Sequence, residues 1–566
     1  MDFYLVYSWI VDVPVEMSKT IIRDSTLALR GAVNGAFANR EPWQVAAITT
    51  TTVLSLVWLW SLINQDESIY TRLKRRVFKL TRKIPMVQAK INEELVKLKK
   101  DFENDMLKSC GNLEYITKMP FESMNEEQIL KKLDEHLQLG NYKYKDGKVS
   151  GAVYTCNPKL VQMVKEVYGK ASYTNPLHSD LFPGICKMEA EVIRMLSGLF
   201  HGGSDACGSM TTGGTESIVM ACKAYRDYAR EVRGIKRPNM VLPVTAHTAF
   251  DKAGQYFNIY RRTVAIDPQT TKVDIKAMEK AINKNTIMLV GSAPNFPYGT
   301  IDDIQAIAKL GLKYNIPVHV DACLGGFIII FMKRAGYPLK PFDFAVKGVT
   351  SISADTHKYG FTPKGSSVIL YSEPKYRHYQ FTVSTDWPGG IYGSPTVNGS
   401  RAGGVIAATW ATMLFHGEDG YTESTKRIVD ITKYIENGLR KIKNIYIFGV
   451  PDTSVIAFGS KDFDIYRLSD ALNKKGWNLN GLQFPPGLHI CITDVHTQEG
   501  IADQFVNDVK EQVAEIMKNP GQVVEGKMAI YGVSQALPDR SLVGDFIKLF
   551  LDSLVYTPQQ NHTSGK

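Results

Sequence analysis

The feature that most constrains this chain is an uncharged, apolar run of 21 residues near its N-terminus. The run extends from Trp43 to Ile63 and reads WQVAAITTTTVLSLVWLWSLI. A helix of that length spans about 30 Å, the thickness of one hydrocarbon core, and tryptophan near both ends suits the two interfaces. A buried core helix is the alternative. A cleavable signal peptide fits poorly, because the run starts late and has no clear small-residue cleavage site. We therefore expect one membrane span over residues 43–63.

The charge distribution predicts the orientation of that span. The net charge is +10, and residues 64–100 carry +7 of it, with eleven Lys/Arg against four Asp/Glu. The positive-inside rule places this basic stretch, and the long chain after it, in the cytosol, with residues 1–42 in the lumen. The same stretch could touch anionic lipid headgroups. Because the basicity is confined to this stretch, we expect no nucleic-acid partner.

The sequence lacks the patterns that usually indicate several classes of protein. The 566 residues contain only seven Cys and no C-x-x-C, H-E-x-x-H or G-x-x-x-x-G-K-[ST] pattern. A disulfide scaffold, a zinc site and a P-loop nucleotide site are therefore not expected, and we predict no metal centre.

The remaining chain divides into four further regions that differ in their pattern of apolar and charged residues. Residues 64–149 look like a helical stalk and arm, residues 420–556 like a smaller α+β domain, and residues 557–566 like a polar tail. In residues 150–419, short apolar runs alternate with helical patterns, which predicts an α/β domain with a mainly parallel sheet and helices on both faces. The strands expected there are 240–244, 286–291, 317–320, 344–346 and 367–371, and the helices are 186–199, 215–232, 273–282 and 304–314.

Three segments of this domain could carry chemistry. Residues 211–217 read TTGGTES before an apolar helical run. Glycines and hydroxyls at a helix start expose backbone N–H groups that suit a phosphate, although Thr215 as an ordinary cap explains the pattern equally well. Asp321 ends a buried strand, where α/β sheets place ligands, or else caps the next helix. Lys358 follows His357 and would be a Schiff-base amine if it is not a solvated surface lysine.

The order of these segments is more specific than any one of them. Gly213, Gly214 and Thr215 come first, then His247, then Asp321, then Lys358. Pyridoxal 5'-phosphate needs such a set: a loop for its phosphate, a flat ring for stacking, a carboxylate at the pyridine nitrogen and an amine at the aldehyde carbon. The sequence therefore favours a pyridoxal-phosphate enzyme.

On these residues the chain resembles the fold-type I pyridoxal-phosphate enzymes, in the branch of the glutamate and aromatic amino-acid decarboxylases. Within that branch it is most similar to the sphingosine-1-phosphate lyases, and the resemblance covers nearly the whole chain. It rests on SGAVY (150–154), NPLHSDLFPG (175–184), TTGGTES (211–217), AHTAFDKA (246–253), GSAPNFPYGTIDDI (291–304), HVDACLGGF (319–327), SADTHKYGFTPKG (353–365) and GGIYGSPTVNGSRAGG (389–404).

The resemblance implies an activity and a setting. It implies retro-aldol cleavage of the C2–C3 bond of sphingosine 1-phosphate, or of a related phosphorylated long-chain base, to a long-chain aldehyde and phosphoethanolamine. It also implies an endoplasmic-reticulum membrane anchor and a homodimer with shared active sites, in which the 389–404 loop could serve the partner's site. Tethering would raise the encounter rate with a substrate that resides in membranes.

The resemblance also implies site residues. Lys358 would be the Schiff-base lysine, Asp321 and His247 would act with it, and Gly213, Gly214, Thr215 and His357 would help to bind the cofactor. Tyr154, His178 and Lys364 would lie near the substrate phosphate, since their side chains can all donate to phosphate oxygens. Tyr392 would line the cleft or donate a proton, and Cys323 would line the site, although a packed small residue explains Cys323 as well.

Two questions remain open at this stage. The base that deprotonates the C3 hydroxyl could be a tyrosine, Lys364, Lys358 or the substrate phosphate. The rival functions are an amino-acid decarboxylase on the same fold and a non-catalytic membrane scaffold. The decarboxylase would want a cationic clamp for a carboxylate, and the scaffold would need none of the cofactor residues.

Overall fold

The computed structural model describes residues 26–28, 30–63, 69–111, 113–140, 142–523 and 540–558. Most of the predicted lumenal segment 1–42 and of the predicted tail 557–566 lies outside these residues. The chain forms two compact units, residues 1–91 and 92–566, which are described separately.

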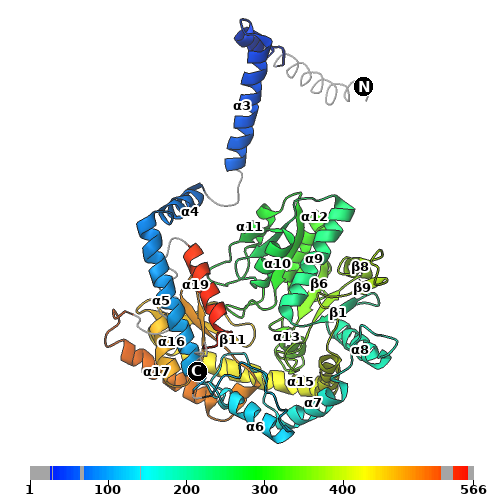
Figure 1. The fold of residues 1–566 in the computed structure, drawn as a ribbon, viewed down its shortest axis with the longest axis vertical. Coiled ribbons are helices and arrows are strands. Elements are labelled where there is room, and N and C mark those ends of the chain that lie inside the picture. The colour runs from blue at the N-terminus through cyan, green and yellow to red at the C-terminus, as the bar shows by residue number, and fades with distance from the viewer. Residues whose placement is uncertain are drawn as a thin grey trace, which may run out of the picture. The chain divides into compact units, whose positions relative to one another are not determined.

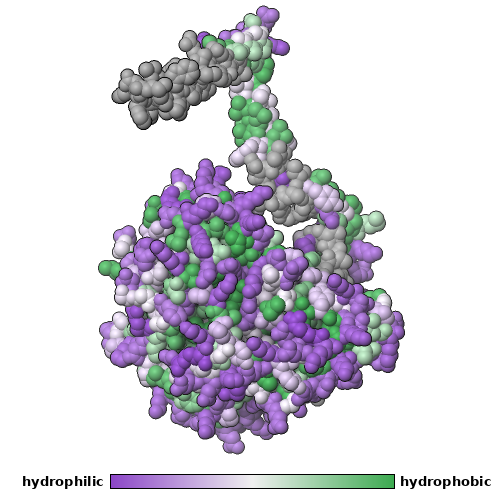
Figure 2. Space-filling view, turned by 180° about the vertical axis from the view of Figure 1, so that it is seen from behind, coloured by the Kyte–Doolittle hydropathy of each residue, from purple (hydrophilic) through white to green (hydrophobic). Residues whose placement is uncertain are grey.

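The first unit is helical and contains the predicted span. Its helices are α3 (Pro42–Ile63), α4 (Ile69–Thr81) and the first part of α5 (Pro85–Ser109). Within α3, the stretch Pro42–Trp60 is long and apolar enough to cross a membrane, and none of it is buried. Figure 2 shows hydrophobic side chains around this helix. Length, composition and exposure are thus compatible with a membrane anchor.

A seven-stranded sheet forms the centre of the second unit (Figure 1). Its strand order is β1-β7-β6-β5-β4-β2-β3, and all neighbours are parallel except β7, which runs antiparallel to both β1 and β6. This confirms the mainly parallel α/β sheet. The strands are β1 (Cys207–Thr211), β2 (Asn239–Pro243), β3 (Tyr260–Val264), β4 (Thr286–Ser292), β5 (Val318–Asp321), β6 (Val349–Ala354) and β7 (Ser367–Tyr371).

Helices cover both faces of this sheet, as β7 shows. Val368 and Leu370 belong to one hydrophobic core, whereas Ile369 and Tyr371 belong to a second. Side chains alternate across a strand, so the two cores lie on opposite faces. One core contains α9 (Gly214–Arg233) and α10 (Ala249–Phe257). The other contains α8 (Pro183–Leu199), α12 (Ile304–Tyr314), α13 (Gly326–Met332) and α15 (Gly403–Arg440).

A second, smaller sheet follows in the chain. It is antiparallel, with the order β10-β11-β13-β12. Its strands and the helices near them in sequence are β10 (Tyr446–Ile447), β11 (Val455–Gly459), β12 (Asn480–Leu482), β13 (Gly487–Cys491), α16 (Ile465–Lys474) and α17 (Ile501–Ile516). Helix α15 runs across the predicted boundary at residues 419 and 420, with a break at Gly417. The domain bounds stay a prediction.

The other described elements connect or flank these layers. They are α6 (Glu126–Leu137), α7 (Pro158–Ala171), α11 (Ile275–Ala281), α14 (Pro374–His378), α19 (Arg540–Ser553), and the two-stranded sheet of β8 (Thr382–Ser384) and β9 (Tyr392–Ser394).

The predicted strands differ from the observed ones at residues 344–346 and at β1, β3 and β6, which were not predicted. Residues 344–346 form a turn, because the Asp343 carboxylate accepts the N–H of Ala345 and the Asp343 carbonyl accepts the N–H of Val346. Strand β1 was not predicted, because CGSMT has little strand propensity of its own. It forms by pairing along its whole length with β7.

Candidate active site

A small polar pocket contains most of the predicted cofactor residues. Its volume is about 320 Å³, and its lining comes from residues 212–216 with Ile218, from His247, from Cys323, and from Asp355, His357 and Lys358. These segments follow β1, β2, β5 and β6 in the chain. Because the carboxyl ends of parallel strands meet at one edge of a sheet, segments distant in sequence converge there.

The start of α9 forms one wall of this pocket. The cap residue is Gly213, the helix begins at Gly214, and no side chain caps it, so Thr215 lies inside the first turn. A Cβ on Gly214 would lie 2.6 Å from Asp355 Oδ1 and 2.7 Å from Cys323 Sγ, so only glycine fits. The uncapped N–H groups and the helix dipole make this wall suitable for an anion.

Glu216 holds the loop before α9 in place. Its Oε2 accepts hydrogen bonds from the backbone N–H of Thr212 at 2.7 Å and from the Thr212 hydroxyl at 2.6 Å. Its Oε1 accepts the N–H of Val397 at 3.0 Å, which ties the 389–404 loop to the same turn. Sequence reasoning missed this residue, and only its position in the TTGGTES segment could have pointed to it.

Lys358 is paired with a carboxylate that the sequence analysis also missed. Lys358 Nζ lies 2.8 Å from Asp355 Oδ2, and Asp355 is 3% exposed. Burial opposes the charged form of Lys358, but the Asp355 carboxylate outweighs burial and raises the pKa of the amine. In turn, Lys358 more than offsets the burial of Asp355 and lowers its pKa. The signal for Asp355 was an acid three residues before the lysine, directly after a strand.

Asp321 lies beneath the pocket, at the end of β5. Its Oδ1 accepts the N–H of Cys323 at 3.1 Å and the Ser353 hydroxyl at 3.4 Å. Cys323 itself lines the pocket, and burial, followed by the nearby Asp321, raises the pKa of its thiol well above the usual value. Cys323 is therefore a neutral wall of the site.

A buried hydrogen-bond chain continues from Asp321 into the core. His319 Nε2 lies 3.2 Å from the Ser353 hydroxyl, and His319 Nδ1 lies 2.8 Å from the Ser351 hydroxyl. Tyr225 donates to that second hydroxyl at 2.7 Å. If each hydroxyl passes its proton on, the imidazole carries its proton on Nε2 and Ser353 donates to Asp321. Burial lowers the pKa of His319 from 6.5 to about 4, so the ring is neutral at pH 7.

Two histidines complete the pocket. His247 has its Nδ1 bonded by the backbone N–H of Ala249 at 3.1 Å, and its ring is exposed at the pocket wall. His357 Nδ1 accepts the N–H of Ser366 at 3.2 Å, and its Nε2 lies 3.6 Å from Asp355 Oδ2. These hydrogen bonds fix the orientation of both rings. Burial lowers the pKa of His357.

The predicted substrate residues fall into two groups. Lys364 lies 4.9 Å above the Tyr154 ring and donates to the His357 carbonyl at 3.4 Å, so these two residues adjoin the pocket. Burial, followed by Lys358, lowers the pKa of Lys364. His178 is exposed, Tyr392 packs near Trp387 with ring centres 6.2 Å apart, and neither lines the pocket within one chain.

The residues present fit pyridoxal phosphate. An uncapped helix start, where glycine alone fits, suits the phosphate. The exposed His247 ring offers a flat surface for stacking, and the buried Asp321 offers a negative charge for the pyridine nitrogen. Lys358 supplies the amine. Asp355 Oδ1 is buried without a hydrogen-bond partner among the described residues, so the pocket retains one unused polar atom.

Comparisons with known proteins agree with this geometry. The family described as "Pyridoxal-dependent decarboxylase conserved domain" matches residues 113–461. A sphingosine-1-phosphate lyase of Drosophila melanogaster is 65% identical over 93% of this chain and 97% of its own length. Sphingosine-1-phosphate lyase 1 of Rattus norvegicus is 52% identical over 94% of each chain. A solved sphingosine-1-phosphate lyase of Burkholderia pseudomallei has a TM-score of 0.73 at 38% identity, covering 79% of this chain and 99% of its own.

The fold and the pocket thus define a pyridoxal-phosphate-dependent enzyme of the decarboxylase type. Within that class, the identities and their near-complete coverage are decisive. The chain belongs to the sphingosine-1-phosphate lyase family.

Proposed function

We propose that this enzyme cleaves the C2–C3 bond of sphingosine 1-phosphate, or of related phosphorylated long-chain bases, to a long-chain aldehyde and phosphoethanolamine. The observation that carries the proposal is the pairing of a complete cofactor pocket with Lys364 and Tyr154 beside it. A cation packed on a phenol, next to the cofactor lysine, suits a substrate that carries its own phosphate.

Each pocket residue has a task in this proposal. Lys358 would supply the amine that holds the cofactor. The backbone N–H groups of residues 213–215 would bind its phosphate, His247 would offer its ring for stacking, and Asp321 would hold a proton at the ring nitrogen. When bound, the cofactor supplies an electron sink for the bond that breaks. His357 and Asp355 orient the lysine.

The substrate phosphate is assigned to Lys364, Tyr154 and His178. Lys364 and Tyr154 lie against each other within one chain, whereas His178 does not line the same pocket. We therefore assign His178 and Tyr392 to the pocket of a second copy, in a homodimer with shared sites. Exposed apolar side chains beside them, Leu181 at 66%, Trp387 at 57% and Ile391 at 87%, support a covered surface there.

The anchor has a functional reason in this proposal. Helix α3 holds the enzyme at the endoplasmic-reticulum membrane in a single pass, with the N-terminus in the lumen and the catalytic unit in the cytosol. The basic residues after the span support this orientation. An enzyme on the bilayer meets a membrane-resident substrate more often than a free one does.

Product analysis tests the proposal. The purified full chain, loaded with pyridoxal phosphate, is incubated with sphingosine 1-phosphate. Equal amounts of long-chain aldehyde and phosphoethanolamine are expected. Release of carbon dioxide from an amino acid, with no cleavage of the lipid, would instead support a decarboxylase. Mixing Lys358→Ala chains with His178→Ala chains tests the shared site, because one intact site per heterodimer should restore part of the activity.

A further inference from the structure

A second cavity, distinct from the Lys358 pocket, lies at the far end of α13. Its volume is about 1030 Å³, and none of its lining residues belongs to the Lys358 pocket. The walls come from the end of α8, the end of α13, the following loop 338–345, and α15 around its break at Gly417. We propose that this cavity binds a single-chain anionic amphiphile, such as a long-chain carboxylate. This inference goes beyond the proposed activity and does not depend on it.

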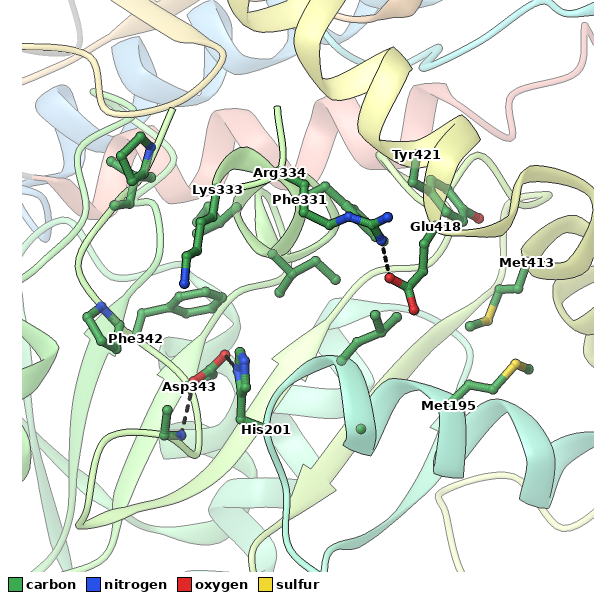
Figure 3. A pocket seen from close by; sticks show the side chains of 18 of the residues that line it. Met195, His201, Phe331, Lys333, Arg334, Phe342, Asp343, Met413, Glu418 and Tyr421 are labelled. Carbon is green, nitrogen blue, oxygen red and sulfur yellow. Dashed lines mark hydrogen bonds and ion pairs between the residues drawn. The ribbon is translucent and has the colours of Figure 1, made fainter. Parts of the chain in front are cut away.

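The walls of the cavity suit a hydrocarbon chain. The lining includes Phe331 and Phe342, which are 1% and 3% exposed, and Met195 and Met413, whose sulfurs lie at the same end of the cavity in Figure 3. Methionine side chains are unbranched and adapt to irregular chains. Leu414, which is 54% exposed, leaves an apolar edge at the opening. The volume is at the top of the range of about 300–1000 Å³ for ligand pockets.

The charged side chains that line the cavity are not all paired. The carboxylate of Asp343 accepts the N–H of Ala345 and is paired with His201 at 2.8 Å, and Glu418 is paired with Arg334 (Figure 3). The Glu418 carboxylate is therefore paired with a guanidinium, and the Asp343 carboxylate is hydrogen-bonded to an imidazole and to a backbone N–H. In contrast, Lys333 and Lys340 have no ion pair among the residues that the structure describes. The lining thus includes two ammonium groups without an ion pair in the described part of the chain, whereas both of its carboxylates are hydrogen-bonded.

The arrangement of these groups gives the ligand a direction. In Figure 3, Lys333 reaches down beside Phe342, at the end away from Met195 and Met413. An anionic head near Lys333 would therefore leave its chain between the aromatic rings, toward the two thioethers. A neutral head would gain no ion pair with Lys333, and a cationic head would be repelled by it.

Photolabelling of the full chain with its cofactor tests the site. The probe is hexadecanoic acid that carries a diazirine near the chain end. Labelled peptides should contain Met195, Leu199, Met413 or Leu414. Labelling should be displaced by hexadecanoate and by hexadecyl phosphate at concentrations at least tenfold below those needed with hexadecylamine.

Variants separate a built site from adsorption. Lys333→Glu reverses one unpaired charge on the surface and should raise the half-displacing concentration of hexadecanoate at least fivefold. Lys276→Glu, an exposed lysine on α11, is the matched control and should change nothing. Met195→Trp fills the chain end and should abolish labelling there. If the Met195→Trp variant does not fold, the displacement measurement with Lys333→Glu still tests the proposal.

Three results would overturn the proposal. Labelling spread over the surface would indicate adsorption. Equal displacement by hexadecylamine, or no effect of Lys333→Glu, would remove the anion selectivity. Absence of labelling, together with protection of the Leu414 peptide from hydrogen exchange only in a dimer, would show that a second copy covers this face.

Discussion

Helix α13 lies between two cavities that differ in size and in the chemistry of their walls. The turn before its first residue contributes Cys323 to the Lys358 pocket, and its last residues line the larger cavity. The first pocket is small and crowded with titratable groups that are paired with each other. The second is three times as large, and its floor is aromatic and aliphatic. Chemistry needs fixed charges at short range, whereas a hydrocarbon chain needs only volume and apolar surface.

One side chain nevertheless links the large cavity to the segment that carries Lys358. The Tyr421 ring lines the large cavity and stacks on Phe331, with centroids 5.2 Å apart and an interplanar angle of 14°. Its hydroxyl donates to the carbonyl of Gly360 at 2.8 Å, two residues beyond Lys358. The differences between the two cavities, and the Tyr421 contact that links them, predict which substitutions affect one cavity and which affect both.

The largest effect is expected from Lys358→Ala. Loss of the amine removes cofactor attachment and exchange, so turnover should fall to background while the circular dichroism spectrum stays unchanged. Lys276→Ala is the matched control on α11 and should keep full turnover. Full activity of Lys358→Ala would refute the assignment of the site.

The next effect is expected from Asp355→Ala. This change leaves the Lys358 ammonium buried without its carboxylate, which costs about 3 kcal/mol of unfolding free energy when a buried pair is broken. Asp355→Asn keeps the shape and should cost less. In both variants the pKa of Lys358 should fall, so in cofactor-free protein the acetylation of Lys358 at pH 8, followed by mass spectrometry, should be faster than in the unmodified chain. An unchanged acetylation rate would contradict the role of this pair.

Acid should destabilise the fold through His319, which is hydrogen-bonded near the Lys358 pocket and does not line the large cavity. The pKa of His319 is about 4 in the folded protein and 6.5 in the unfolded chain. The unfolded chain therefore binds this proton first. The contribution of His319 to stability is complete above about pH 6.5 and is lost as the pH falls toward 4, at about 1.4 kcal/mol per pH unit.

Urea titrations at several pH values measure this slope. The histidines His489 and His496 have the same low pKa of about 4 and add to the total. His319→Gln should therefore reduce the slope by the share of one proton without abolishing it. A slope identical to that of the unmodified chain would show that His319 is charged in the fold.

The smallest effect is expected from Tyr421→Phe. The ring stack survives, but the Gly360 carbonyl loses its donor, which costs about 1 kcal/mol for a hydrogen bond in the core. Urea unfolding measures the loss. Photolabelling of the large cavity should remain unchanged, because the hydroxyl points away from the chain site. A loss of labelling would show that the two cavities are coupled through the Tyr421–Gly360 hydrogen bond.

The sequence alone was sufficient to predict the features that depend on short segments of the chain. The uncharged run at 43–63 nearly coincides with α3 (Pro42–Ile63), because an uncharged, mainly apolar run of 21 residues has few alternatives to a helix. The alternation of strands and helices predicted the main sheet, and helix 304–314 was predicted with the bounds of α12. The order of Gly213, His247, Asp321 and Lys358 indicated the cofactor, because each role needs a particular residue type.

Other features depended on which segments, far apart in the chain, the fold brings together. Strand β1 has little propensity and exists because it pairs with β7, about 160 residues later in the chain. Asp355 could not be recognised as the partner of Lys358 until the turn after β6 brought the two atoms to 2.8 Å. Likewise, the order of donors from Tyr225 through His319 to Asp321 joins three elements that the sequence does not relate.

Residue types and their order therefore determined the long apolar helix near the N-terminus, the fold class and the cofactor, because these depend on local composition and on the chemistry of single side chains. The tertiary structure alone decided which charges are paired, which atoms stay unpaired, and where a second cavity opens beneath α13. These properties depend on distances of a few ångströms between segments far apart in the chain, over which electrostatic and packing energies change steeply.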